Sequence, residues 1–479
     1  MPGVRHIALD TCGASPPCLW RTLAMVFFRR HQTQILLILA LIAMGAGFCA
    51  LAVPAEFRAA QQQLIGFPDA DVQAQQARPM VLAALGFLPA LAALVYAFGG
   101  TIDRYITRQF LGIFGICLCG LFMIWMLIDL TNNFSDLRGS PHVLRTVGKY
   151  YLTSTPAILL QLLPYSLLLS LLHALGKLST NREIIAVIQS GRGILRITLP
   201  LMIFSLFCTL MSLGLNYQWA PGFDKRQDEI LAEARGTQTA AASHVLYRNP
   251  ENRRLWMIGS FPLAYQKGKP LLNVEVTTTG ENHILQSRLS ASHARWDRTK
   301  HQWTFDHPVI SRYVPGQAPV FEKLSGPLIL DDWSETPWQL IKPGLSAVHL
   351  GVPDLSGWLQ AHARHPSFAD PSPYLTQWHY RWALPFTCLV TVLLATPLAL
   401  HFSRRAPGGD IFLAVVLSAL LLLISNIVIA FGEAGTLQPA LAAWLPNIAF
   451  SLLGIYLFRG RISGRPFHHP LRQLFARRT

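Results

Sequence analysis

The sequence predicts an α-helical membrane protein with about eight transmembrane helices and one β-rich domain outside the membrane. Hydrophobic residues make up 51% of the 479 residues and charged residues only 14%, whereas soluble proteins carry roughly 25% charged residues. Eight separate apolar runs are long enough to cross a bilayer. A polar segment between the fifth and sixth runs, from about Pro221 to Thr376, has the alternating pattern of short β-strands.

Each predicted transmembrane helix needs roughly 20 apolar residues, because about 30 Å of hydrocarbon is crossed at about 1.5 Å per residue. Proline interrupts several of the runs, and helices in lipid tolerate this when neighbouring groups bond the freed carbonyls. The eight runs are Ile35–Val53, Met80–Phe98, Phe110–Leu130, Ala157–Leu178, Ile197–Leu215, Trp382–His401, Ile411–Phe431 and Leu441–Phe458.

Basic residues flank the runs unevenly, and this asymmetry predicts the orientation, because short loops rich in Arg and Lys stay in the cytoplasm. We expect both termini in the cytoplasm, the long polar segment outside, and no cleaved signal peptide in the first run. These flanks explain the formal net charge of +15 and argue against nucleic acid as a partner, since no basic stripe lies on a soluble face. The basic residues on the cytoplasmic side are Arg21, Arg29, Arg30, Arg104, Arg108, Lys177, Arg182, Arg192, Arg196, Arg404, Arg405, Arg459, Arg461, Arg465, Arg472, Arg477 and Arg478.

The long polar segment predicts a domain of short antiparallel strands. Valines alternate with polar residues in Asn273–Thr277, and Arg295–Phe305 has the pattern of two strands joined by a turn at Asp297–Lys300. Such repeated strands are typical of a sandwich, a barrel or a jelly roll. A short helix is expected at Asp354–His365, leading back to the membrane. The segment contains no cysteine, so we expect no disulfide in it.

The sequence lacks the residues for catalysis. The phosphate-binding pattern G-x-x-x-x-G-K-[ST] is absent: Gly176-Lys177 is followed by Leu178, and Leu171 stands where the first glycine is needed. The spans contain no Ser/His/Asp set and no H-E-x-x-H, and the cysteines lack metal-ligand spacing. We therefore expect no enzyme activity and no cofactor in this chain, and any ATP and Mg²⁺ would be used by a partner.

A short amphipathic helix is predicted on the cytoplasmic side at residues 179–191. Ser179 or Thr180 is expected to cap it and Gly191 to end it. It is either an ordinary interfacial helix or a coupling helix that docks into a groove of a cytoplasmic ATPase, with its isoleucines as anchors. In the second case, Glu183 would pair with a basic residue of the ATPase. The residues assigned to coupling are Arg182, Glu183, Ile184, Ile188 and Gly191.

Four motifs follow one another along the chain between Ile102 and Phe386. Their combination is similar to the LptF/LptG permeases of the lipopolysaccharide exporter, a resemblance that begins at Thr101 and continues to the end. The motifs are I-D-R-Y-I at Ile102–Ile106, L-G-K-L-S-T-N-R-E-I-I-A-V-I-Q-S-G at Leu175–Gly191, N-Y-Q-W-A-P at Asn216–Pro221 and H-Y-R-W-A-L-P-F at His379–Phe386.

The resemblance implies a core of six spans with a periplasmic β-jelly-roll-like domain between its third and fourth helices. Residues 1–100 lie outside the resemblance and add two spans, so the topology of the core is preserved. The expected divisions are an N-terminal extension at 1–100, permease helices one to three at 101–217, the β domain at 218–376, and permease helices four to six with a basic cytoplasmic tail at 377–479.

The resemblance also implies partners in the bacterial inner membrane. A second permease of this type would pair with this chain on a dimeric cytoplasmic ABC ATPase. Lipopolysaccharide would enter sideways among the membrane lipids and leave along stacked jelly rolls of periplasmic bridge proteins. By analogy with the family, the third and sixth spans of this chain would border one lateral gate.

Five residues at the outer end of the third and fourth spans are candidate contacts for the lipid. Some family members carry a basic residue near the outer end of the first family helix, a region that holds Asp129 and Asn132 here. Asp129 is otherwise a plain interfacial residue. Arg138, Arg145 and Lys149 would offer positive charge to phosphates, or they are ordinary interfacial residues.

Two other functions stay open at this stage. In the first, the chain would move a different amphiphile, such as a lipoprotein or another glycolipid. The acidic Asp129, in the region where some family members carry a basic residue, keeps this possibility open. Alternatively it would be a membrane-anchored periplasmic scaffold without transport. The presence of an ATPase partner and the identity of the bound lipid distinguish the three.

Overall fold

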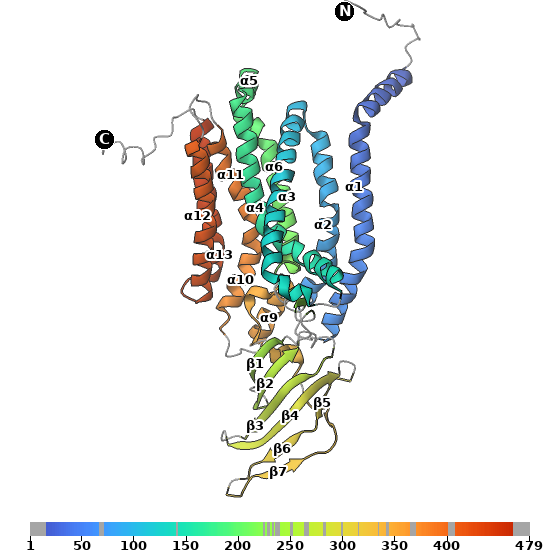
Figure 1. Ribbon diagram of the computed structural model, residues 1–479, viewed down its shortest axis with the longest axis vertical. Helices are drawn as coiled ribbons and strands as arrows, with labels where there is room; N and C mark the ends of the chain where they lie inside the picture. The colour runs from blue at the N-terminus through green and yellow to red at the C-terminus, as the bar shows by residue number, and fades with distance from the viewer. Residues whose placement is uncertain are drawn as a thin grey trace, which may run out of the picture.

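The computed structural model has a bundle of long helices with a β-sheet domain at one end of it, and the N-terminal side of the chain lies at the opposite end (Figure 1). It describes the chain from residue 16 to residue 462, with side chains in α1 described from Gln34 onward. Segments left out within that range are 67–70, 140–141, 224–225, 228–229, 232–233, 235–239, 250–251, 263–267, 281–283, 298–299, 315, 334, 342–343, 365–369 and 401–407.

The eight predicted spans are confirmed: within these described residues, eight helical segments are long and apolar enough to cross a membrane. The sixth is two helices, α10 and α11, joined by the 3₁₀ turn η4, because Pro385 lacks the N–H that a continuous helix needs. The segments are α1 Pro16–Gly66, α2 Val72–Phe98, α3 Thr101–Arg138, α4 Val143–Thr180, α6 Ile194–Gln218, α10 Ser372–Ala383 with η4 Leu384–Phe386 and α11 Thr387–Ala399, α12 Gly408–Glu433, and α13 Pro439–Ile462.

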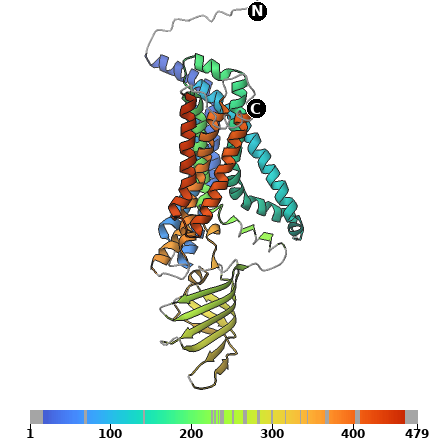
Figure 2. The ribbon, with the colours of Figure 1, turned by 90° about the vertical axis from the view of Figure 1, so that its left-hand side faces the viewer.

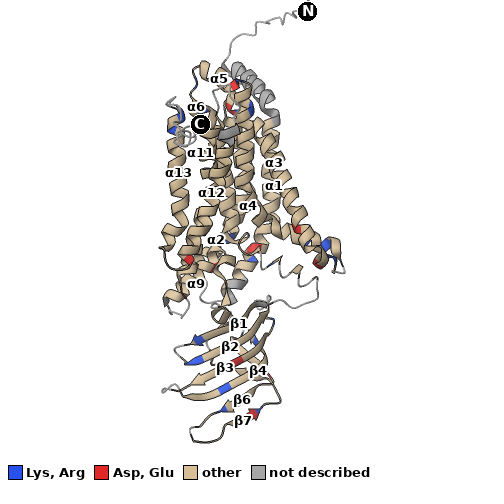
Figure 3. Cartoon of the chain, turned by 60° about the vertical axis from the view of Figure 1, so that its left-hand side comes forward, with Lys and Arg blue, Asp and Glu red and all other residues tan. Residues whose placement is uncertain are grey.

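Charged residues gather at the two ends of the helical bundle, and its middle is almost free of them (Figure 3). This is the distribution that a hydrocarbon layer imposes, because a charge in the bilayer centre is costly. Part of the predicted basic set lies outside the described side chains: Arg21, Arg29, Arg30, Arg404, Arg405, Arg465, Arg472, Arg477 and Arg478.

The predicted β-rich domain is confirmed as an antiparallel sheet of eight strands in the order β1-β2-β3-β4-β5-β8, with β6 paired to β4 and β7 paired to β6. The long β4 pairs with β6 along its first half and with β5 along its second half, so the sheet divides there. The arrangement is consistent with the expected jelly-roll-like domain. The strands are β1 Ala240–Asn249, β2 Arg254–Pro262, β3 Leu271–Thr279, β4 Leu285–Asp297, β5 Gln302–Asp306, β6 Val309–Arg312, β7 Val320–Lys323 and β8 Leu328–Leu330.

The local strand predictions hold at residue level. Val274 and Val276 of β3 are buried while Asn273 is exposed, as the alternation indicates. The expected hairpin is present, because β4 ends at Asp297, β5 begins at Gln302 and these two residues are paired. The register of this pairing fixes which face of both strands points into the core.

The core of the β domain is aromatic and continues into the helices beneath it. Trp256 and Trp303 are fully buried, with ring centroids 5.1 Å apart. Helix α9, Val352–Arg364, confirms the predicted short helix, and its Trp358 stacks on Tyr374 of α10. Together with the short α8, Pro337–Ile341, these helices belong to one hydrophobic cluster with the sheet. The sheet is therefore packed onto the end of the sixth span.

The N-terminal extension is bound to the rest of the chain by polar contacts near the sheet. Tyr217 of α6 donates to the Ala74 carbonyl of α2 at 2.9 Å. Asp354 of α9 accepts from Gln75 of α2 at 3.3 Å and from Gln218 of α6 at 3.2 Å. One carboxylate thus joins the extension, the third core helix and the base of the β domain.

A second contact inside the membrane brings α2 against α6. Gly214 of α6 faces Leu85 of α2 so closely that an added Cβ would lie 2.5 Å from a Leu85 methyl group. Small residues are the usual means by which membrane helices approach closely. Through both contacts the extension packs against the outside of the core, where it would brace α6.

The Gly214 contact generates a testable prediction about the extension. Gly214→Val would force α2 away from α6, with an expected cost of about 1–3 kcal/mol for overpacking. Hydrogen–deuterium exchange should then rise in the first turns of α2, where Ala74 and Gln75 lose their partners. Gly120→Val is the matched control, because a Cβ at Gly120 meets nothing within 4 Å. Equal exchange in both variants would contradict the bracing role.

Glu335 is the buried charge of the β domain. Its side chain accepts from Asn249 at 2.9 Å and from Arg254 at 2.8 Å, and its carbonyl accepts from the Trp303 indole at 2.7 Å. The Arg254 guanidinium also lies 4.5 Å from the centroid of the Trp333 ring. Removal of the carboxylate leaves the arginine and the amide without these partners in a nearly dry site.

Glu335→Ala is therefore expected to destabilise the β domain by about 3–5 kcal/mol, the cost of breaking a buried ion pair. Thermal unfolding of the detergent-solubilised chain, followed by tryptophan fluorescence, measures the loss. Glu322→Ala is the control, because its ion pair with Arg312 is exposed and such pairs contribute only about 0–1 kcal/mol. The role assigned to Glu335 fails if the two variants unfold at the same temperature.

Candidate functional site

The predicted short helix is present as α5, Glu183–Gln189, at the end of the bundle farthest from the sheet (Figure 1). The predicted cap is wrong: Ser179 and Thr180 still belong to α4, and the residue before α5 is Arg182 in a left-handed conformation with φ 59°. The chain needs this sharp turn because α4 and α5 follow each other almost directly. Gly191 follows α5 with φ +83°, a conformation that glycine adopts without strain.

Glu183 is held by two neighbours within the chain. Its carboxylate accepts from the Tyr105 hydroxyl of α3 at 2.9 Å and from the Asn181 amide at 3.1 Å. The side chain is half-buried, so one face of the carboxylate stays open to water or to a partner. These two hydrogen bonds fix the orientation of the Glu183 carboxylate. Because both donors are uncharged, the negative charge of Glu183 remains.

The two isoleucines assigned to coupling lie on the inner face of α5. Ile184 is 2% exposed and Ile188 is half-buried, and both pack on the core of α3, α4 and α6. They hold α5 in place and do not project from the molecule, in contrast to the expected anchors. A shallow groove of about 270 Å³ lies beside them, lined by Tyr105, Glu183 and Val187 among others. This groove would accept an apolar side chain next to a carboxylate.

An ion pair fixes the start of α3 against α6 next to this groove. Asp103 accepts from the Gly100 backbone N–H at 3.0 Å and pairs with Arg196 of α6 at 2.9 Å. The N-terminus of a helix favours a carboxylate, and the arginine adds a second positive partner. The sequence reading missed Asp103, Tyr105, Asn181 and Arg196 as parts of this site. Asp103 and Tyr105 stand in the I-D-R-Y-I motif and Asn181 in the Leu175–Gly191 motif, but neither motif shows that these side chains meet Glu183 or Arg196.

Asp129 lies at the opposite end of α3, where it joins α3 to α4. It accepts from Asn133 at 3.1 Å and from the Tyr150 hydroxyl of α4 at 3.2 Å. Tyr151 donates to the Met126 carbonyl at 3.3 Å. The carboxylate is thus used to close the helix pair, which makes it a poor contact for a lipid phosphate.

The other four lipid-contact candidates lie on the surface near this helix pair. Asn132, Arg138, Arg145 and Lys149 are exposed, and Arg145 and Lys149 share one face of α4 because they are four residues apart. Figure 2 shows α3 leaning away from the other helices toward this end, while the first turns of α4 run back toward the bundle. The basic side chains therefore surround the end of a protruding helix pair.

The third and sixth spans, both expected to border a lateral gate, differ in how far they are buried within this chain. In the apolar window of the third span, α3, only 6% of residues are buried, as a helix that faces a lipid or a partner requires. The sixth span, α10–α11, has 72% buried and lies inside this chain, so the expectation that it borders a gate is not supported. The open flank on the other side is α12, where Phe412, Leu423 and Phe431 are exposed.

Two of the sequence motifs meet in space at the junction with the β domain. The Asn216 amide donates to the Arg381 carbonyl at 2.7 Å, and both side chains are buried. The Arg381 guanidinium donates to the Asn216 side-chain oxygen and to the Val348 carbonyl. Within the described part of the chain, no group of three or more His, Cys, Asp or Glu residues is arranged to hold a metal ion.

Comparison with known proteins places this architecture in a family. The family described as "Lipopolysaccharide export system permease LptF/LptG" matches residues 104–460. The lipopolysaccharide export system permease protein LptF of Escherichia coli strain K12 is 26% identical over 311 residues, which cover 62% of this chain and 77% of that protein. The LptF protein of Shigella flexneri matches with the same values. The chain, a multi-pass protein of the inner membrane, belongs to the LptF/LptG permease family.

Proposed function

We propose that this chain is a permease subunit of a lipopolysaccharide exporter. It would pair with a second permease of the family, and a dimeric cytoplasmic ABC ATPase would supply the energy from ATP and Mg²⁺. The family match over residues 104–460 is the observation that carries the proposal. The chain itself would bind no cofactor, and its contribution would be to change shape around the lipid.

The arrangement of α5 supports its assignment as the ATPase contact. The helix lies at the end of the bundle opposite the sheet, with a groove beside it and a half-open carboxylate at its rim. A partner would insert an apolar side chain into this groove and place a basic group near Glu183. Arg182 and Gly191 would set the position of α5 through the two left-handed turns that flank it.

The same arrangement supports the orientation. Arg182, Arg192 and Arg196 lie near α5, and α13 ends with Arg459 and Arg461 at that end of the bundle. By the positive-inside rule, this end would lie in the cytoplasm. The β domain at the other end would then lie in the periplasm.

The open surfaces of the chain fit a route for an amphiphile. Exposed apolar faces on α3 and α12 would border a cavity shared with the second permease, and the exposed Arg138, Arg145 and Lys149 would meet phosphates at its outer rim. The sheet ends farthest from the membrane in β7, whose residues are all exposed, including Phe321. An exposed edge strand of this kind accepts a further strand, so a periplasmic jelly-roll bridge protein would stack there.

The proposal is tested by purification of the tagged chain in mild detergent, with bound proteins and lipid identified by mass spectrometry. An ABC ATPase, a second permease of the family and lipopolysaccharide are expected together. If an ATPase copurifies with a lipoprotein or another glycolipid, the proposed mechanism stands but the cargo is that other lipid. An intact membrane complex without any ATPase would favour the scaffold function and contradict transport.

Glu183→Ala should weaken the association with the ATPase, because it removes the acid that faces the partner. The expected loss is about 2 kcal/mol, or roughly 30-fold in Kd, as for other truncated charge pairs at interfaces. The ATPase that copurifies with the inserted chain is the quantity to measure. Tyr105→Phe should give a smaller loss, since it removes one of the two bonds that orient the acid.

Glu322→Ala is the control for this experiment, because it removes an exposed carboxylate at the far end of the molecule. It should leave the amount of bound ATPase unchanged. Unchanged ATPase association and unchanged lipopolysaccharide transport in Glu183→Ala would remove Glu183 from the proposed contact.

A further inference from the structure

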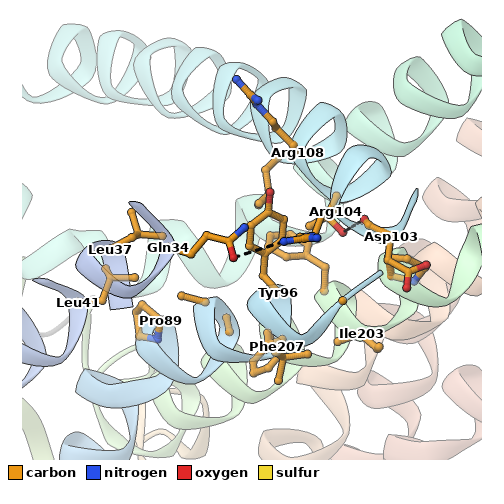
Figure 4. Close-up of a pocket in the computed structure, with 18 of the residues that line it drawn as sticks. Gln34, Leu37, Leu41, Pro89, Tyr96, Asp103, Arg104, Arg108, Ile203 and Phe207 are labelled. Carbon is orange, nitrogen blue, oxygen red and sulfur yellow. Dashed lines mark hydrogen bonds between the residues drawn. The ribbon is translucent and has the colours of Figure 1, made fainter. Parts of the chain in front are cut away.

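A cavity of about 830 Å³ lies between the N-terminal extension and the permease core (Figure 4). Helices α1 and α2 form one wall of it, and α3 and α6 form the other. The family match begins at Arg104, so the cavity exists only because the extension is present. Its volume is within the range of about 300–1,000 Å³ that is usual for ligand pockets.

The cavity has an apolar interior and a polar end. Leucine, alanine, proline and phenylalanine side chains line most of it, including Leu41, Pro89 and Phe207. The polar residues that line it are Gln34, Tyr96, Asp103, Arg104, Thr107 and Arg108. Most of these lie in the first two turns of α3, near the end of the bundle that carries α5. The cavity is therefore amphipathic along the direction of the helices.

The net charge of its polar end is positive. Asp103 is neutralised by its ion pair with Arg196 at 2.9 Å. Arg104 reaches across the cavity toward the uncharged Gln34, with 3.4 Å between its nitrogen and the amide oxygen. Arg108 lies one helical turn farther along α3, about 6 Å deeper into the membrane, and is exposed. Among the described residues, no hydrogen bond or ion pair compensates the Arg108 charge.

In the proposed orientation, Arg108 lies at the cytoplasmic edge of the third span, just before Phe110, where the anionic headgroup of a lipid would pair its charge. The Arg104 guanidinium faces Gln34 at the cavity, whereas the Arg108 side chain points away from it in Figure 4. Arg104 would donate to the oxygens of a phosphate there, and Arg108 would reach the same phosphate by turning its flexible side chain back toward the cavity. The apolar interior below them provides space for acyl chain. Phosphate above hydrocarbon is the chemistry of a membrane phospholipid.

We propose that this cavity binds one anionic glycerophospholipid from the leaflet at the α5 end of the bundle. Its phosphate would contact Arg104 and Arg108, and an acyl chain would fill the space between α2 and α6. The lipid would act as a structural link between the extension and α3. The site is on the extension side of α3, away from Asp129 and the exposed basic residues at the other end. The inference does not depend on which cargo the permease moves.

Native mass spectrometry of the purified full-length chain, titrated with phosphatidylglycerol or with phosphatidylcholine, tests the proposal. The wild type should bind one phosphatidylglycerol in preference to phosphatidylcholine. Arg104→Gln with Arg108→Gln should weaken phosphatidylglycerol binding by about 25-fold, from a factor of about five for each basic residue near an anionic lipid. Ala93→Phe should reduce binding of both lipids, because Ala93 lines the cavity and a larger side chain fills it.

Arg459→Gln is the matched control. It removes an exposed arginine at the same end of the bundle, on α13, at the opposite flank from α1 (Figure 1). Its phosphatidylglycerol affinity should equal that of the wild type. Thermal unfolding of every variant shows whether it is folded, and the single variant Arg108→Gln replaces the double variant if the latter is not.

Two results would overturn the proposal. The first is equal affinity for the two lipids, or an affinity that the arginine variants do not change. The second comes from a photo-cross-linking amino acid placed at Ala93 in the complete complex in native membranes. Capture of a protein segment there, in place of a phospholipid, would show that a partner helix fills the cavity.

Discussion

The buried bonds between Asn216 and Arg381 hold the membrane helices and the β domain in one structure. The two residues are 165 positions apart, at the end of α6 where the chain leaves the core and at the end of α10 where it returns. The whole β domain lies between them, so this contact closes the loop that contains that domain. The Arg381 guanidinium also bonds the Val348 carbonyl, which belongs to the base of the β domain. Both side chains are buried, and a buried polar group that loses its hydrogen bonds is costly, so these bonds favour one arrangement of the junction.

The N-terminal extension depends on the same junction. Asp354 lies in α9, a few residues after Val348, and it receives bonds from α2 and from α6. The extension is therefore joined to the base of the β domain at one end, while a cavity lies between it and α3 at the other end. Protein contacts thus join the extension to the base of the β domain, whereas at the other end the proposed lipid would complete its link to α3.

Local sequence patterns predict the elements of this fold, and they do not predict its contacts. Apolar runs specify the eight spans, and alternation specifies the β4–β5 hairpin, because both signals come from residues close together in the chain. One partner of Glu183 is Tyr105, 78 residues away, and no period in the sequence relates the two. The burial of Ile184 could not be predicted for a similar reason. An amphipathic pattern shows that a helix has an apolar face, but it does not show which surface covers that face. Arg182 in the left-handed region was missed because its conformation follows from the α4–α5 turn.

Helix α3 is the element that connects the two ends of the proposed mechanism. Its 38 residues extend over about 57 Å, with Tyr105 bonded to Glu183 near one end and Asp129 bonded to Tyr150 near the other. Most of its middle faces outward, so a tilt of α3 would disturb few packed side chains. Under the proposed function, a partner that displaces α5 would pull on the start of α3 through the Tyr105–Glu183 bond. The Asp129–Tyr150 bond would then carry that motion into the outer part of α4, where the exposed basic residues lie.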